Sequence, residues 1–244
     1  MSHAPKPAYR RILLKLSGEA LMGRQNFGVE ESACRQIASA IKEVYDQGVQ
    51  IGIVVGGGNI FRGTQAEAFG FARTPADHIG MLGTVINGLV LQQSLAGLGC
   101  ESRVMSALNC DSIVETYIWG HAMDYIEKGT IVIFVGGTSN PYFTTDTAAA
   151  LRASEIEAEV LFKATKVDGI YDKDPVKHKS AVKYSELTYS DVLTKNLSVM
   201  DATAIALCRE NQIPIVVFNL FEPGALLKAV CGEEIGSKVI GGEQ

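Results

Sequence analysis

The chain has 244 residues, of which 47% are hydrophobic, and its formal net charge at pH 7 is −5. That length is enough for one large core or two small domains. A mildly acidic chain is poorly suited to nonspecific nucleic-acid binding, which needs lysine and arginine to neutralise phosphates, so we expect no nucleic-acid partner. The five cysteines are scattered and form no C-x-x-C pair, which disfavours zinc and redox motifs and indicates reduced thiols in the cytoplasm.

The organisation of the chain is simple. Residues 1–9 are polar with two prolines and predict a flexible tail rather than a signal peptide, and residues 10–244 predict a single domain. No apolar run approaches the roughly 20 residues of a membrane span, so we expect no membrane segment. Helix and strand signals alternate throughout, which predicts an α/β protein with a mostly parallel sheet.

Hydrophobic periodicity and turn signals place the elements. In chain order we predict a strand at 11–16, a helix at 31–47, a strand at 51–55, a helix at 79–93, a strand at 103–106, a helix at 121–128 and a strand at 131–135. Beyond these we predict a helix at 146–156 capped by Asp146, a strand at 159–163, helices at 191–197 and 201–210, a strand at 214–218, and a last helix opened by Pro223-Gly224. Gly80, Gly83 and Gly88 in the second helix indicate either close packing, also against another subunit, or a tolerated surface helix.

Three of the predicted strands end in turns of small residues. One strand runs into Gly56-Gly57-Gly58 with Arg62 four residues later, another into Gly136-Gly137, and the first into Ser17-Gly18. Backbone amides that carry no side chain can approach a phosphate closely. Because the carboxyl ends of parallel strands share one edge, these turns predict one phosphate-rich site. Neither the P-loop motif nor the dinucleotide fingerprint occurs in the sequence.

Three further segments carry polar chemistry, and each has two interpretations. Lys15, within an apolar strand, is either a phosphate cation or an edge-strand lysine whose head reaches solvent. Residues 140–147 contain threonines and an aspartate at a helix start, and either bind a polar substrate or cap the helix. Residues 163–175 contain two turn signatures, and the ring of Tyr171 either packs beside a purine or belongs to a surface loop.

Taken together, motifs in these segments resemble the amino-acid kinase superfamily, and within it the bacterial uridylate (UMP) kinases. The motifs lie at residues 12–19, 56–63, 77–81, 140–146 and 163–169, and the resemblance covers about residues 9–240. It implies a three-layer α/β/α sandwich around a mostly parallel sheet. It also implies the reaction ATP + UMP → ADP + UDP in pyrimidine nucleotide biosynthesis, Mg²⁺ accompanying ATP, and a cytoplasmic homohexamer activated by GTP and inhibited by UTP.

The resemblance implies roles for individual residues. For ATP these are Lys15, Leu16, Ser17, Gly18, Gly58 and Arg62 at the phosphates, and Thr165, Tyr171 and Asp174 at the adenosine half. For UMP they are Gly57, Asp77 at the ribose, and the loop Thr138, Ser139, Asn140, Pro141, Tyr142, Phe143, Thr144 and Thr145. For effector response they are Gly23, Arg24, Gln25, Asn26, Phe27 and Gly28, in a variable stretch. Ser139 stands where the family often has glycine, which puts the backbone shape of its loop in doubt, and Tyr171 replaces a frequent phenylalanine but keeps the ring.

Transfer of a phosphoryl group between two anions needs positioning and charge neutralisation rather than a strong base. We predict Lys15 and Arg62 as catalytic cations, with Asp146 and Asp201 orienting lysines or holding Mg²⁺ through water. No metal ligand by direct side-chain contact can be assigned. Three alternatives stay open: a family member acting on a carboxylate or carbamate, a non-catalytic relative that binds nucleotides or oxyanions, and a regulator linked to nucleic acid.

Overall fold

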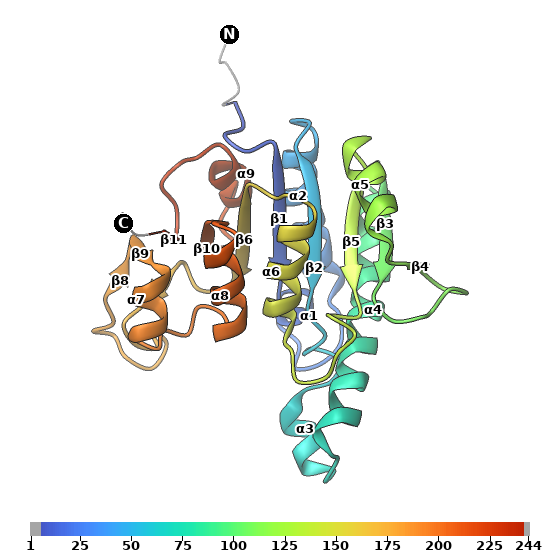
Figure 1. Cartoon of the computed structure of the whole chain (residues 1–244), viewed down its shortest axis with the longest axis horizontal. Helices are drawn as coiled ribbons and strands as arrows, with labels where there is room; N and C mark the ends of the chain where they lie inside the picture. Colours follow the sequence, from blue (N-terminus) through green and yellow to red (C-terminus); the bar gives the residue numbers. More distant parts are fainter. Residues whose placement is uncertain (1–5, 242–244) are drawn as a thin grey trace.

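The computed structural model describes residues 6–241, which form a nine-stranded sheet with helices on both faces (Figure 1). The strand order is β4-β3-β5-β2-β1-β6-β10-β11-β9, and neighbouring strands are parallel except for β10 and β11. The strands are β1 (Arg11–Leu16), β2 (Gln50–Val55), β3 (Ser102–Ser106), β4 (Glu115–Thr116), β5 (Ile131–Val135), β6 (Val160–Thr165), β9 (Glu186–Thr188), β10 (Ile215–Asn219) and β11 (Ser237–Ile240). A separate antiparallel pair consists of β7 (Ile170–Tyr171) and β8 (Lys183–Tyr184).

Two hydrophobic layers attach the helices to the sheet. One face carries α1 (Gly18–Met22), α2 (Glu31–Tyr45), α4 (Arg73–Ala96) and α9 (Ala225–Val230). The other face carries α5 (Trp119–Glu127), α6 (Thr145–Glu155), α7 (Tyr189–Thr194) and α8 (Ala202–Glu210). Alternate residues of the central strand β1 enter the two layers, as expected for a strand buried on both sides. The predicted three-layer α/β/α fold is thus confirmed.

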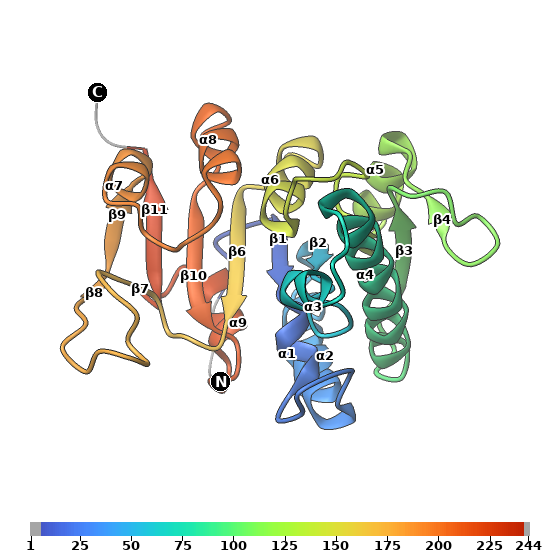
Figure 2. The same cartoon turned by 90° about the horizontal axis from the view of Figure 1, so that it is seen from below.

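The parallel strands direct their carboxyl ends to one edge of the sheet, at the bottom of Figure 1. Helix α1 and the short helix α3 (Gly63–Ala68) lie at this edge, and Figure 2 views the molecule from that side. The turns after β1, β2 and β5 all lie here. The sequence prediction that the small-residue turns share an edge is therefore confirmed.

Helix α4 is longer than predicted, and its glycines have a packing role. A Cβ added at Gly83 would lie 3.1 Å from the carbonyl oxygen of Gly57, and one added at Gly88 would lie 2.4 Å from Val135 Cγ1. The glycine spacing therefore lets this helix approach the sheet and the turn after β2 of its own chain. A contact of α4 with another subunit stays a prediction.

The expectation that no segment matches a membrane span needs a correction at α4. By length and composition alone this 24-residue helix could cross a membrane, and 44% of its most apolar window is buried inside the protein. The helix packs against α2, β3 and β5. Such contacts are those of a helix in the core of an α/β sandwich.

The start of the chain and one helix start also differ from expectation. Residues 1–5 of the predicted tail lie outside the described residues, whereas the N–H of Ala8 donates to Val230 O (2.8 Å) and the ring of Tyr9 packs edge-on against Phe162. Asp146 is not the cap of α6. Thr144 takes that place, because its hydroxyl accepts the N–H of Asp146 (3.0 Å).

Candidate active site

The turn after β2 is wedged between α1 and α4. The N–H of Gly56 donates to Leu16 O (2.9 Å), which joins the ends of β2 and β1. A Cβ added at Gly18 would lie 2.9 Å from Gly56 O, and one added at Gly57 would lie 2.4 Å from Gly80 O. At Gly58, by contrast, an added Cβ would meet nothing within 4 Å. Gly18 and Gly57 therefore permit close packing, while Gly58 borders open space where a ligand can approach its backbone.

A buried amide pair braces the same turn. Asn59 and Asn87 exchange hydrogen bonds, with Nδ2···Oδ1 distances of 3.1 Å and 2.6 Å. Asn87 Nδ2 also donates to Gly56 O (2.7 Å), and Asn59 Nδ2 donates to Gly28 O (2.7 Å). Because both side chains are buried and all these groups are paired, the network fixes the turn without an unsatisfied amide.

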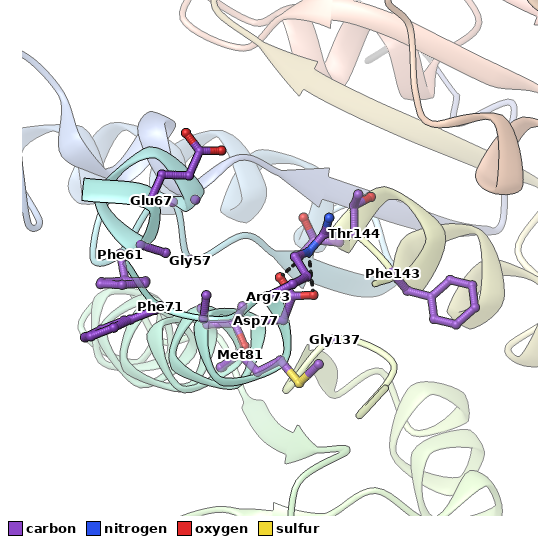
Figure 3. A pocket seen from close by; sticks show the side chains of 17 residues that line it. Gly57, Phe61, Glu67, Phe71, Arg73, Asp77, Met81, Gly137, Phe143 and Thr144 are labelled. Carbon is purple, nitrogen blue, oxygen red and sulfur yellow. Dashed lines mark hydrogen bonds and ion pairs between the residues drawn. The ribbon is translucent and has the colours of Figure 1, made fainter. Parts of the chain in front are cut away.

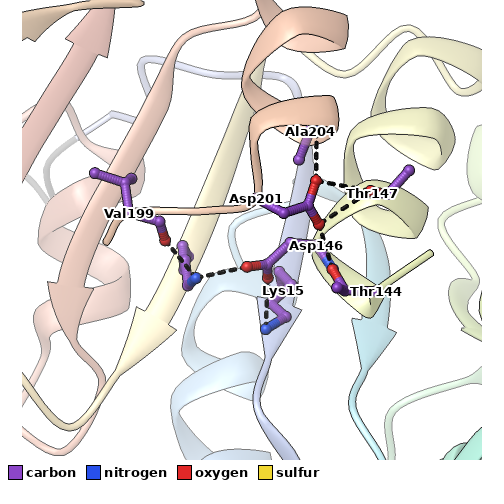
Figure 4. A network of polar contacts seen from close by, with 8 residues as sticks. Lys15, Thr144, Asp146, Thr147, Val199, Asp201 and Ala204 are labelled. Atoms are coloured by element: carbon purple, nitrogen blue, oxygen red, sulfur yellow. Dashed lines mark hydrogen bonds and ion pairs between the residues drawn. The ribbon is translucent and has the colours of Figure 1, made fainter. Parts of the chain in front are cut away.

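Two lysines from adjacent strands share one carboxylate at the centre of this edge (Figure 4). Lys15 Nζ lies 2.7 Å from Asp146 Oδ1, and Lys163 Nζ lies 2.8 Å from Asp146 Oδ2. Lys163 also donates to the carbonyl oxygen of Val199. Since β1 is the central strand and Lys15 is buried, the interpretation of Lys15 as an edge-strand lysine is wrong.

The electrostatics of this cluster follow from its burial. Burial alone would raise the pKa of Asp146, but the charges of Lys15 and Lys163 outweigh it and hold that pKa below 3.8. Burial lowers the pKa of the Lys163 ammonium, with the charge of Asp146 opposing it. One carboxylate is thus paired with two buried lysines. The pairing leaves positive charge that a phosphate group can neutralise.

Asp201 takes part in the neighbouring network rather than contacting a cation. Its carboxylate accepts hydrogen bonds from the hydroxyls of Thr144 and Thr147 and, at 2.8 Å, from the N–H of Ala204 (Figure 4). It therefore caps α8 and ties that helix to the start of α6. In the structure Asp201 holds the segment that presents Asp146.

A cavity of about 470 Å³ opens beside the glycine turn (Figure 3). Phe61 and Phe71 lie together at one end, with ring centroids 6.4 Å apart, and Arg73 and Asp77 face each other near Thr144. The lining includes the predicted residues Gly57, Gly58, Asp77, Phe143, Thr144 and Thr145. Thr138, Ser139, Asn140, Pro141 and Tyr142 lie outside the lining, and their contact with a ligand stays a prediction.

A second cavity, of about 360 Å³, adjoins Lys163. The three residues predicted for the adenosine half of ATP, Thr165, Tyr171 and Asp174, all line it, together with Lys163. The hydroxyl of Tyr171 donates to Asp168 Oδ1 (2.7 Å), which fixes the ring at the cavity. Lys163 lines this cavity, and Thr145, next to Asp146 in the chain, lines the first. The Lys15–Asp146–Lys163 cluster therefore adjoins both cavities.

The remaining predicted residues lie near this edge. Arg62 is exposed, pairs with Glu19 (2.9 Å) and donates from Nε to Gly58 O (2.9 Å), so its cation borders the glycine turn. Ser139 has φ 63°, the left-handed conformation that glycine adopts freely, which accounts for glycine being frequent there. The predicted effector segment, residues 23–28, contacts the turn through Gly28, whose N–H donates to Asn59 O (2.9 Å).

Sequence reasoning did not assign roles to Lys163, Arg73 and Asn87. Lys163 carried a signal comparable to that of Lys15, since it too is a lysine in an apolar strand. Arg73 precedes Asp77 by four residues on a helix, a spacing that pairs opposite charges. Asn87 lies inside a helix and gave no signal, because its partners are set only by tertiary packing.

A sheet edge with glycine turns, buried lysines and two adjoining cavities is suited to binding phosphate groups. The profile of the amino acid kinase family matches residues 10–219, and the chain belongs to that family.

Two relatives and one solved structure are similar to this chain over most of its length. The chain is 60% identical over 220 residues to "Uridylate kinase" of Protochlamydia amoebophila, covering 90% of this chain and 86% of the relative. It is 52% identical over 239 residues to "Uridylate kinase" of Dichelobacter nodosus, covering 98% and 99%. The crystal structure of UMP kinase from Bacillus anthracis superposes with a TM-score of 0.92 at 40% identity, covering 95% of this chain and 96% of that one.

Proposed function

We propose that this protein transfers the γ-phosphoryl group of ATP to UMP, giving ADP and UDP. The observation that carries the proposal is the Lys15–Asp146–Lys163 cluster, which adjoins two cavities at one edge of the sheet. The names of the relatives support UMP as the acceptor, and the resemblance to their family supports ATP as the donor. The two cavities support a separate site for each nucleotide. A carboxylate or carbamate substrate would leave Asp77 and much of its cavity of about 470 Å³ without a purpose.

The larger cavity is assigned to UMP and the smaller to ATP. Asp77 offers carboxylate oxygens to ribose hydroxyls, and Thr144 and Thr145 lie where the UMP phosphate approaches α6. The N-terminus of this helix favours an anion. In the smaller cavity Tyr171 packs beside the adenine, and Thr165 and Asp174 bind the rest of the adenosine. The transferred group then passes between the cavities, next to both lysines.

Catalysis in this arrangement rests on positioning and charge. The attacking UMP oxygen is anionic at neutral pH, so no general base has to remove a proton from it. Lys15 and Lys163 neutralise charge that would otherwise keep the two nucleotides apart, and Asp146 fixes both ammonium groups in place. Gly58, in the glycine turn, and Arg62, which donates to Gly58 O, hold the ATP phosphates.

Mg²⁺ is proposed to enter with ATP. Among residues 6–241 no three His, Cys, Asp or Glu side chains cluster in a way that could hold a metal ion. The carboxylates of Asp146 and Asp201 are engaged by lysines and threonines, so either would reach the ion through water. These residues fit an ion held mainly by phosphates, whose chemistry is to neutralise phosphate charge.

Regulation, assembly and location are proposed from the resemblance. GTP activation and UTP inhibition would act through residues 23–28, a proposal supported by the hydrogen bonds between Gly28 and Asn59 beside the glycine turn. Lys166, which follows β6, donates to Gly23 O (3.2 Å) and links the same segment to the second cavity. A homohexamer, a cytoplasmic location and a place in pyrimidine nucleotide synthesis complete the proposal.

A substrate panel tests the proposed reaction. ADP release is measured with ATP and UMP, CMP, acetylglutamate or carbamate, each with and without GTP. The proposal predicts turnover with UMP far above the other acceptors, and faster turnover when GTP is present. Turnover with acetylglutamate or carbamate would place the protein elsewhere in its family, and tight ATP binding without any product would indicate a non-catalytic relative.

A further inference from the structure

The acceptor cavity contains one arginine that no role has yet explained. Arg73, in the first turn of α4, contacts both carboxylate oxygens of Asp77 through Nε, at 3.0 Å and 2.9 Å. Its guanidinium carbon lies 5.2 Å from the centre of the Tyr142 ring. Arg73 thus contacts Asp77 of its own helix and Tyr142 of the loop after β5, at the rim of the cavity.

Tyr142 is held in a costly conformation at this contact. Its φ of 73° is left-handed, which a residue with a large side chain rarely adopts. Tyr142 as a whole is 64% exposed, so burial does not hold it there. What holds it is Asp77 Oδ2, which accepts the Tyr142 N–H at 2.7 Å, together with the cation over the ring.

We propose that Arg73 is a positioning residue for the acceptor nucleotide, and this inference rests on the proposed function. Arg73, Asp77 and Tyr142 form a clasp that joins α4 to the loop after β5 across the cavity rim. By fixing both oxygens of Asp77, Arg73 sets the direction in which that carboxylate faces the cavity.

The clasp leaves Asp77 able to bind a ligand. An ionised carboxylate has about four lone-pair sites. Oδ2 accepts from Arg73 and Tyr142, whereas Oδ1 accepts from Arg73 alone. A ribose hydroxyl can therefore bind Oδ1 without opening the clasp. Loss of Arg73 frees the carboxylate to rotate and the loop to move, so the acceptor is bound less tightly while the lysine cluster stays intact.

Steady-state kinetics of Arg73→Gln test the clasp. We expect the KM for UMP to rise about 5- to 30-fold, because the variant loses both an exposed ion pair and a cation–π contact. The kcat and the KM for ATP should stay within about twofold of wild type. Tyr142→Ala removes the ring under the Arg73 guanidinium and should also raise the KM for UMP. Lys42→Gln, which removes an ion pair of the same helical spacing on α2, is the matched control and should change none of these constants.

The outcomes separate this inference from the proposed function. If wild type does not phosphorylate UMP, the proposed function fails. If wild type does so but Arg73→Gln has an unchanged KM for UMP, the inference fails alone. A fall in kcat, or an equal rise in both KM values with a lowered melting temperature, would make Arg73 a structural residue and would also overturn the inference.

Discussion

Replacing Asp146 by asparagine removes the negative charge between the two lysines and leaves the shape of the side chain nearly unchanged. The carboxylate stands between Lys15 and Lys163, and the three side chains are 14%, 9% and 17% exposed, respectively. Breaking a buried ion pair by removing one partner costs about 3–5 kcal/mol. Because asparagine still accepts one hydrogen bond and a little water reaches the lysines, we take the lower limit of about 3 kcal/mol. For a chain of this size that lowers the melting temperature by about 6–12 °C.

The assay is urea unfolding followed by the fluorescence of Trp119, the single tryptophan, together with thermal unfolding. Asp124→Asn, an exposed change of the same chemistry on α5, is the control and should shift stability by less than about 0.5 kcal/mol. Because ATP brings negative charge to the uncompensated lysines, it should raise the melting temperature of Asp146→Asn more than that of wild type. A variant as stable as the control would show that this carboxylate does not hold the lysines.

The pH dependence of the same variant has a defined sign. In wild type the folded pKa of Asp146 lies below 3.8, so its contribution to stability is complete above about pH 5 and is lost as pH falls. The stability gap between the two proteins should therefore close on acidification. The folded pKa of Lys163 lies below its ordinary 10.5, so the contribution of this group to the free energy of unfolding rises with pH. The rise is larger in the variant, because the charge of Asp146 no longer opposes the lowering of that pKa. The gap should then also narrow as the pH rises from neutral toward 10.5, and a gap that widens there would contradict the reasoning.

Two further predictions concern the lysine and the glycine turn. Lys15→Ala should fold, because Asp146 keeps Lys163 as its partner, but should lose about 10² to 10³ in kcat; a near-normal kcat would remove Lys15 from the mechanism. Gly57→Ala should lower the free energy of unfolding by about 1–3 kcal/mol, since its Cβ meets a backbone oxygen at 2.4 Å, while Gly58→Ala should fold normally and raise the KM for ATP. Equal stability of the two alanine variants, measured by urea unfolding, would contradict the packing of the turn.

The sheet was largely predictable because its central strands are continuous apolar runs between turn signals. Strand β5 begins and ends where predicted, and β2, β3 and β10 are displaced by about one residue. The short strands β4, β7, β8, β9 and β11 were not predicted, because two to four residues carry no measurable alternation. Helix α4 was predicted too short, since its glycines lower helix propensity and its extra turns are set by packing.

The site was predictable in its composition but not in its connections. The glycines in the turns were enough to predict a phosphate site, because the space around a glycine backbone is a property of the local sequence. The contacts of Asp146 depend on parts of the chain that are far apart in sequence. Its position at a helix start favoured a capping role. Its partner Lys15 lies on a distant strand, which only the folded sheet brings close. Arg73 shows the opposite case, because its pairing with Asp77 follows from helical spacing that was present in the sequence.

The central claim is that two nucleotides meet beside Lys15 and Lys163, each seated in its own cavity. A crystal structure with UMP and a non-hydrolysable ATP analogue measures this directly. The account predicts ribose hydroxyls of UMP at Asp77, adenine at Tyr171, and the phosphates of both within hydrogen-bond distance of the two lysine ammonium groups. Phosphates bound away from these lysines, or both nucleotides competing for a single cavity, would contradict it.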